Sequence, residues 1–247
     1  MAAWHEDDRF WETFQGYMFN PARVAAAKSE VDAMLVLLGV APKSSILDLC
    51  CGPGRHSLEF ARRGFLVTGV DRTKDYLRQA REQGAMERLQ IEFVESDMRN
   101  FVRADAFDAA INFFTAFGYF DDPAEDRQVV ANVHRSLRAG GKFLVDVNGK
   151  EILARKFRER DWNPRDDGSV VLEERRVVDG WTRVENRWTW IRGTERREST
   201  FTLRLYSGAE LRELLRSVGF GKVELFGSLA GADYDHNAER LIAVATR

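Results

Sequence analysis

The sequence predicts an α/β fold, built on a doubly wound, mostly parallel seven-stranded sheet with N-terminal helices and an antiparallel β insertion after the fifth strand. Three observations predict it. Between residues 45 and 147, short apolar runs rich in branched side chains alternate with longer segments of helical period, a pattern typical of βαβ units. Three β-like runs separated by short Gly-containing turns come next. A helical pattern and two more β-like runs then resume the first arrangement, so the middle region is an insertion.

The five apolar runs are expected to form parallel strands joined by right-handed crossovers. They lie at residues 46–49, 65–70, 91–94, 109–113 and 142–147. Between them, Gly64 and Gly84 are expected to end the first and second helices, and Thr73 to cap the second. Pro123 is expected to open a helix that ends at residues 139–141. Ligands of such sheets bind outside the carboxyl ends of the strands. We therefore expect the functional residues directly after each run.

The insertion is expected to be an antiparallel meander of residues 170–178, 181–191 and 199–206. Alternation places Trp188 and Trp190 on one of its faces. Its many charges are expected to pair across strands on a solvated face; they are Arg175, Arg176, Arg183, Arg187, Arg196 and Arg197 with Glu173, Glu174, Glu185 and Glu198.

A helix at about 208–218 and strands at 222–227 and 240–246 complete the predicted core. The chain thus divides into an N-terminal helical lid (1–42), a core (43–149 and 207–247) and the insertion (150–206). We expect the lid and the insertion to select the substrate.

The charge balance argues against nucleic acid or an anionic membrane as a partner. The 247 residues include 37 Lys and Arg and 39 Asp and Glu, so no global basic field exists. Cys50 and Cys51 are adjacent, which suits a reducing compartment and a packing role. No metal-type histidine spacing, secretory leader or membrane-length apolar run is visible. We expect a cytoplasmic monomer or homodimer without a metal.

The first strand runs into a Gly-Pro-Gly turn and then a helix, which is the sharpest local motif. Gly52 and Gly54 let the backbone approach a ligand and present amide donors at a helix N-terminus. Asp71 ends the second strand, 19 residues after Gly52, where a carboxylate can accept the hydroxyls of a ribose. Asp97 and Met98 follow the third strand and suit the amino group and ring face of an adenine.

A nicotinamide-binding domain would place a ribose acid at a similar distance, but two details disfavour it. The third glycine of its fingerprint is Ser57 here. Asp48 lies inside the first strand, where it would repel a pyrophosphate and attract a cationic amino-acid group.

The segment from Asp48 to Gly54 resembles the first motif of the class I S-adenosylmethionine-dependent methyltransferases, acid-x-Gly-x-Gly-x-Gly, with Cys50 in place of the first glycine. The resemblance covers residues 43–149 and 207–247. Residues 96–101 and 114–120 are similar to segments of small-molecule N-methyltransferases, including those that dimethylate amino sugars, which also carry an antiparallel insertion. The resemblance implies a Rossmann-like fold, S-adenosylmethionine as cofactor, and in-line methyl transfer to nitrogen or oxygen of a small molecule.

The resemblance also implies roles for individual residues. The aromatic segment 10–19 would close over the cofactor, with Arg23 able to reach its carboxylate, or would dock its helix on the core. Tyr119, Tyr206 and His236 are the catalytic candidates, with Tyr234 as a further group able to orient an acceptor nitrogen. The cofactor-binding candidates are Phe14, Arg23, Asp48, Cys50, Gly52, Asp71, Arg72, Asp97, Met98, Asn112 and Phe113.

Two alternative functions use the same pocket. Methylation of RNA would need a basic track and a strong dependence of affinity on salt. A non-catalytic regulator would bind S-adenosylmethionine without turning it over.

Overall fold

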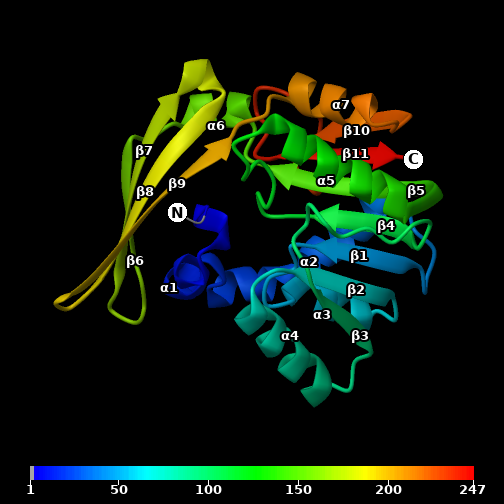
Figure 1. The fold of residues 1–247 in the computed structure, drawn as a ribbon, viewed down its shortest axis with the longest axis horizontal. Helices are drawn as coiled ribbons and strands as arrows, with labels where there is room; N and C mark the ends of the chain where they lie inside the picture. Colours follow the sequence, from blue (N-terminus) through cyan, green and yellow to red (C-terminus); the bar gives the residue numbers. More distant parts are fainter. Residues whose placement is uncertain (1–2) are drawn as a thin grey trace.

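Two β-sheets organise the chain, in a computed structural model that describes residues 3–247 (Figure 1). The larger sheet has seven strands in the order β10-β11-β5-β4-β1-β2-β3. β1 to β5 are parallel, whereas β11 runs antiparallel to both of its neighbours, β5 and β10. These strands are β1 (Ser45–Leu49), β2 (Leu66–Asp71), β3 (Ile91–Glu95), β4 (Phe107–Asn112), β5 (Leu137–Val147), β10 (Lys222–Phe226) and β11 (Leu241–Thr246). The predicted fold class is confirmed.

Helices cover both faces of the large sheet because its central strands are apolar on both sides. In β1, Ile46 packs in the cluster under α2 (Pro21–Leu38) and α3 (Arg55–Arg62). Its neighbour Leu47 packs in the cluster on the opposite face. Helices α5 (Pro123–Ser136) and α7 (Gly208–Ser217) cover that second face, and α4 (Lys74–Met86) packs on β2 and β3.

The second sheet is antiparallel, with the order β6-β7-β8-β9, and stands beside the carboxyl ends of the parallel strands (Figure 1). Its strands are β6 (Arg160–Pro164), β7 (Val170–Val178), β8 (Arg183–Arg192) and β9 (Glu195–Arg204), and α6 (Lys150–Lys156) precedes them. The sequence predicted three of these strands but not β6. β6 is short, largely exposed and ends in a proline, which is tolerated because it lies at the sheet edge.

The N-terminal segment fills the space between the two sheets (Figure 1). It consists of η1 (Trp4–Glu6) and α1 (Asp8–Met18). Phe10, Phe14 and Met18 of α1 form a buried cluster with Val171 of β7 and Phe201 of β9. α1 therefore fixes the position of the second sheet relative to the first.

Two predicted helix ends are wrong. Gly84 lies inside α4, not after it. α5 ends at Ser136 because Leu137 pairs with Phe107 and opens β5, and a register shift in that pairing absorbs the Gly-Gly segment expected to end the helix. Thr73 does occupy the N-cap position of α4, but its side chain makes no capping hydrogen bond.

Candidate functional site

A cavity of about 450 Å³ lies where the carboxyl ends of β1, β2 and β4 and the loop after β3 meet the N-terminal segment and the second sheet. The strand ends and the loops after them form its rim, and the inner face of β7, β8 and β9 forms its roof. The rim includes Asp48, Cys50, Gly52, Asp71, Arg72, Asp97, Met98 and Phe113. The roof includes Glu173, Arg175, Asn186, Trp188, Phe201 and Leu203.

The turn after β1 adopts backbone conformations that favour glycine. Gly52 has φ +56° and Gly54 has φ +82°. A Cβ atom on Gly52 would lie 2.9 Å from the ring of Phe19, so a side chain there would force that ring to move. Cys50 occupies the left-handed region as well, with φ 62°, which explains why the related motif has glycine at this position. The turn therefore brings bare backbone to the cavity wall.

Two acids flank this turn, the buried Asp48 and the partly buried Asp71. Asp71 accepts hydrogen bonds from the backbone amides of Gly52 and Thr73, both at 2.8 Å. Asp48 accepts from the hydroxyl of Ser57 at 2.6 Å. Burial raises the pKa of both carboxyl groups, and these hydrogen bonds oppose the rise only in part. Both acids line the cavity, so a bound donor or cation would stabilise their ionised forms.

Asp97 lines the cavity beyond the end of β3, and Arg99 holds its carboxylate. The backbone amide of Arg99 lies 2.8 Å from Oδ1 of Asp97, and two guanidinium nitrogens lie 3.0 Å from Oδ1 and 2.6 Å from Oδ2. Burial alone would raise the pKa of Asp97, but the bonds from Arg99 outweigh it and hold that pKa below its usual value. The sulfur of Met98 lies 3.4 Å from the thiol of Cys50.

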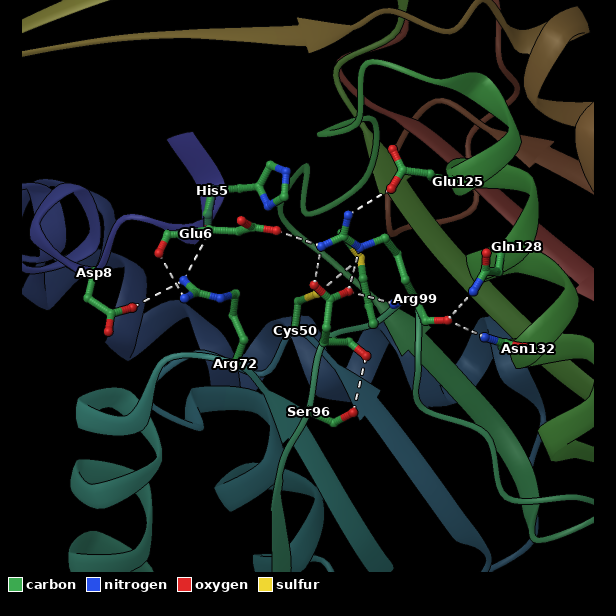
Figure 2. Close-up of polar contacts among 12 residues, drawn as sticks. His5, Glu6, Asp8, Cys50, Arg72, Ser96, Arg99, Glu125, Gln128 and Asn132 are labelled. Atoms are coloured by element: carbon green, nitrogen blue, oxygen red, sulfur yellow. Dashed lines mark hydrogen bonds and ion pairs between the residues drawn. The ribbon is translucent and has the colours of Figure 1, made fainter. Parts of the chain in front are cut away.

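The N-terminal segment is tied to the strand ends by two arginines (Figure 2). Arg72, after β2, donates to the backbone carbonyls of His5 and Glu6 at 2.9 Å each and forms an ion pair with Asp8 at 3.1 Å. Arg99 donates to the Glu6 carboxylate at 2.8 Å. Burial and the nearby Arg99 charge lower the pKa of His5, which lines the cavity. These contacts place η1 over the ends of β2 and β3.

Arg23 enters the cavity from the start of α2. Its guanidinium donates to the backbone carbonyls of Tyr17 and Met18 and lies 4.6 Å from the ring centre of Phe114. Within residues 3–247 no carboxylate forms an ion pair with it. Burial, and repulsion from neighbouring arginines including Arg55, lower its pKa, with Tyr17 acting in the opposite direction. The side chain is thus a partly buried cation without a carboxylate partner in residues 3–247.

The loop after β4 forms the floor and holds unusual backbone. Phe114 and Thr115 both have positive φ, 68° and 57°. Buried Asp146 of β5 stabilises them: its Oδ2 accepts from the Phe114 amide at 2.8 Å and its carbonyl from the Thr115 amide at 3.1 Å. Arg240 forms an ion pair with Asp146 and stacks 5.0 Å from the ring centre of Phe113. Strained backbone held this firmly is typical of functional loops.

Glu173 lies at the roof and is 2% exposed. The Tyr17 hydroxyl donates to its Oε1. Its Oε2 forms an ion pair with Arg175. Glu173 pairs across the strands with Trp188, whose indole N–H is buried without a partner among the described residues. The prediction that Glu173 and Arg175 lie on a solvated face is wrong, because this parity of β7 faces the cavity.

Several predicted site residues do not reach the cavity. Tyr206 is buried and donates a 2.7 Å hydrogen bond to Asp126, while His236 lies on the surface with its side chain 85% exposed. Phe14 is fully buried behind the lining, in the cluster that holds α1. Asn112 is buried under the floor and donates to the carbonyls of Leu49 and Ala116. Of the catalytic candidates, the structure brings only Tyr119 to the cavity, and burial raises the pKa of its hydroxyl.

The sequence reading missed a polar cluster behind the first turn. Glu30 of α2 accepts from Arg55 and lies 2.7 Å from the His56 ring. Arg55 also donates to the carbonyl of Arg23 at 3.0 Å. The cluster thus joins α2 to α3 and fixes the start of α2. The contacts join residues 25 and 26 positions apart, and no local motif signals them.

Residues 46–141 match the family described as "Methyltransferase domain". This range holds the glycine turn, both acids of the first two strand ends and the loop after β3. Residues 46–141 thus form a methyltransferase domain of the S-adenosylmethionine-dependent kind.

Relatives over most of the chain carry methyltransferase names. A dTDP-3-amino-3,4,6-trideoxy-α-D-glucopyranose N,N-dimethyltransferase of Streptomyces venezuelae is 26% identical, covering 87% of this chain and 91% of the relative. A glycine/sarcosine N-methyltransferase of Aphanothece halophytica is 24% identical, covering 90% and 83%. The crystal structure of an S-adenosylmethionine-dependent methyltransferase from Clostridium acetobutylicum superposes with a TM-score of 0.80 at 16% identity, covering 97% of this chain and 98% of that chain. This last likeness shows the shared fold of the methyltransferase domain and its additions.

Residues 3–247 contain neither a candidate metal site nor a candidate membrane-spanning helix. No group of three or more His, Cys, Asp or Glu side chains there could hold a metal ion. Nor is any helix in this range both long and apolar enough to cross a membrane.

Proposed function

We propose that the enzyme methylates an amine nitrogen of a small molecule bound between the strand ends and the second sheet. S-adenosylmethionine, when bound, supplies an electrophilic methyl group on a sulfonium sulfur. Two relatives are named for methylation of amines, one of an amino sugar and one of glycine and sarcosine. The proposal extends that acceptor type to this chain on the chemistry of its cavity.

The rim has groups suited to each part of the cofactor. Asp71 would accept the ribose hydroxyls, since each of its oxygens takes only one backbone donor. Asp97 and Met98 would hold the adenine, and Gly52, which has no side chain, would leave room for the methionine part of the cofactor. Asp48 would pair with the α-ammonium, because burial raises its pKa and a cation would restore its charge.

Arg23 would bind the cofactor carboxylate. A partly buried guanidinium without a carboxylate partner among residues 3–247 is unfavourable, because its charged neighbours are also arginines. A ligand carboxylate supplies the missing counter-charge and a bidentate acceptor. The tie from Arg55 to the Arg23 carbonyl keeps this side chain at the edge of the turn.

The buried carboxylate of Glu173 at the roof is the observation that supports an amine as the methyl acceptor. Its Oε1 accepts from the Tyr17 hydroxyl and its Oε2 forms an ion pair with Arg175. Each carboxylate oxygen can accept more than one hydrogen bond, so an amine N–H of a ligand is a natural further partner. Aromatic rings of Tyr17, Trp188 and Phe201 surround it, and their faces attract a cationic or partly charged amine. Residues 150–206 would then act as the acceptor cap.

The remaining work of the chain is to align the acceptor and exclude water. The N-terminal lid and the roof close the cavity with apolar and aromatic side chains, and exclusion of water strengthens every polar contact inside. Tyr119 faces this space with its pKa raised by burial, so its hydroxyl stays protonated and can act as a hydrogen-bond donor or acceptor. A strong general base is unnecessary when the acceptor reaches the site as a free amine.

We also propose that the partner is not nucleic acid and that the enzyme works in the cytoplasm as a monomer or homodimer. The arginines on the outer face of the second sheet are already paired with glutamates, for example Arg176 with Glu185 and Arg187 with Glu174. They do not form a free basic track of the kind that RNA binding needs.

The test measures methyl transfer from radiolabelled S-adenosylmethionine to primary amines, amino sugars and amino acids, and to the matching alcohols and N-acetyl derivatives. We expect amines to be methylated in preference to their analogues. Glu173→Gln should raise the KM for the amine about tenfold, while leaving the affinity for S-adenosylhomocysteine unchanged. The matched control is Glu174→Gln, whose side chain lies on the outer face and pairs with Arg187. Equal rates for an amine and its alcohol would contradict the proposal.

A further inference from the structure

Arg99 forms contacts with three separate elements at the adenine end of the cavity. Besides Asp97, its guanidinium donates to Glu6 of η1 at 2.8 Å and to Glu125 of α5 at 2.7 Å (Figure 2). The guanidinium also lies 4.7 Å from the ring centre of Phe120 in the loop after β4. Arg99 itself is not part of the cavity lining in the described chain. It therefore acts on the cavity through the groups it holds.

The main chain of Arg99 is anchored as well. Gln128 and Asn132, one turn apart on α5, both donate to its carbonyl oxygen at 2.7 Å (Figure 2). A guanidinium fixed at its base can hold a carboxylate with little loss of side-chain entropy. Arg99 is thus a rigid fork between a residue of the adenine site and a residue of the N-terminal segment.

We infer that Arg99 is a positioning residue that couples adenine recognition to closure of the N-terminal segment, by holding the carboxylates of Asp97 and Glu6 with one guanidinium. The inference rests on the proposed placement of the adenine at Asp97. Arg99 occupies both oxygens of Asp97 and leaves one acceptor position on Oδ2, since that oxygen takes a single bond from Arg99. The orientation of that remaining position, and so the preference for an amino group, depends on Arg99.

Glu6 gives the same guanidinium a second effect. Its bond to Arg99 supplements the Arg72 bonds to the backbone of η1, and Trp4 and His5 of η1 line the cavity. Release of Glu6 should loosen η1 without turning Asp97. Loss of Arg99 should both loosen η1 and let the Asp97 carboxylate turn. Variants of Glu6 and Arg99 therefore separate the two effects.

The experiment compares two ligands, S-adenosylhomocysteine and S-inosylhomocysteine, which carries an oxo group in place of the adenine amino group. Calorimetry gives the affinity ratio and stopped-flow fluorescence gives the dissociation rates. In the wild type, S-adenosylhomocysteine should bind about tenfold more tightly. Arg99→Gln should bring the ratio close to one and raise the dissociation rate, whereas Glu6→Gln should preserve the ratio and raise the dissociation rate severalfold. Arg103→Gln is the matched control, because Arg103 donates two hydrogen bonds to the carboxylate of Glu92 away from the cavity.

Each outcome decides one point. If Arg99→Gln weakens both ligands equally, Arg99 is only structural and the inference fails. If Glu6→Gln leaves the dissociation rate unchanged, there is no coupling to the N-terminal segment. Asp97→Asn distinguishes failure of the proposed adenine site from failure of the role of Arg99. If Asp97→Asn keeps the affinity ratio of the wild type, the proposed adenine site is wrong. If Asp97→Asn loses that ratio but Arg99→Gln keeps it, only the role of Arg99 is wrong. Should Arg99→Gln fail to fold, Arg99→Lys keeps the charge but loses the fork, and its ratio should fall as well.

Discussion

The rim and the roof of the cavity are built in different ways. At the rim, acids and backbone amides follow parallel strands, and their positions come from the strand ends themselves. At the roof, single side chains such as Glu173 project from an antiparallel sheet that is held in place by packing against α1. The rim is part of the shared methyltransferase domain, and the roof is an addition to it. Damage to the rim should therefore affect the cofactor, and damage to the roof should affect the fold of the cap and the acceptor.

The largest expected effect comes from the packing between roof and N-terminal segment. Phe201 is 5% exposed, and its ring centre lies 5.0 Å from that of Trp4 and 5.2 Å from that of Phe10. Phe201→Ala should lower the free energy of unfolding by about 3 kcal/mol, measured by urea denaturation. It should also speed proteolysis within the N-terminal segment. The control, Trp162→Ala, removes a ring that is 68% exposed at the sheet edge and should do neither. Equal stability loss in both variants would show that the roof is not held by this cluster.

At the rim, Asp71→Ala removes a carboxylate that fixes the turn and faces the cavity. The affinity for S-adenosylhomocysteine should fall by about 2–3 kcal/mol, because charge-assisted hydrogen bonds to the ligand are lost together with the anchor of the Gly52 amide. Calorimetry measures the effect. Asp75→Ala, on the exposed face of α4 with Arg78 as its partner, is the matched control. An unchanged affinity in a folded Asp71→Ala protein would remove this residue from the cofactor site.

The same contrast explains what the sequence could predict. The periodicity of the chain predicts the ends of β1, β2 and β3, and the acids at or near these ends line one cavity, because parallel strands end at one edge. Tyr206 and His236 were chosen without such a geometric constraint, and neither reaches the cavity. The inward orientation of Glu173 was not predicted, because both faces of β7 carry charged residues and alternation alone does not say which face points inward. The hairpin turn pairs it with Trp188, and that register was the available signal.

Long-range ion pairs are the other part that the sequence did not predict. Arg99 and Glu6 are 93 positions apart, and Arg55 and Glu30 are 25 apart. A chain with this many charges allows many such pairs, and only the packed fold selects among them. The sequence therefore did not indicate the ion pairs that position the rim, although it did indicate the acids that line the cavity.

A smaller effect is expected where the two regions join. Buried Asp126 of α5 accepts from Tyr206 and pairs with Arg204 at the end of β9, and burial raises the pKa of Asp126 to about 6. Its ordinary value in the unfolded chain is lower, so the folded state binds the proton more tightly. The stabilisation is complete below about pH 4 and is lost as the pH rises through about 6.

Melting temperatures across this range should therefore show a decline that Asp126→Asn flattens. The corresponding loss in the free energy of unfolding should be about 2 kcal/mol at most, because partial ion pairing with Arg204 offsets the cost of burying the Asp126 carboxylate. A variant whose profile keeps the wild-type slope would assign the pH dependence to other groups.

The smallest effect is expected on the outer face of the second sheet, one residue away from the cavity-facing positions. Arg176 and Arg187 pair with Glu185 and Glu174 in full contact with solvent. Exposed pairs of this kind contribute little, because solvent and salt screen them. Arg176→Gln and Arg187→Gln should leave the melting temperature, the affinity for S-adenosylhomocysteine and the methylation of amines unchanged. If these variants instead reduced retention on RNA together with methyl transfer, the outer face would be a substrate surface, and the division of labour between the two faces of this sheet would be reversed.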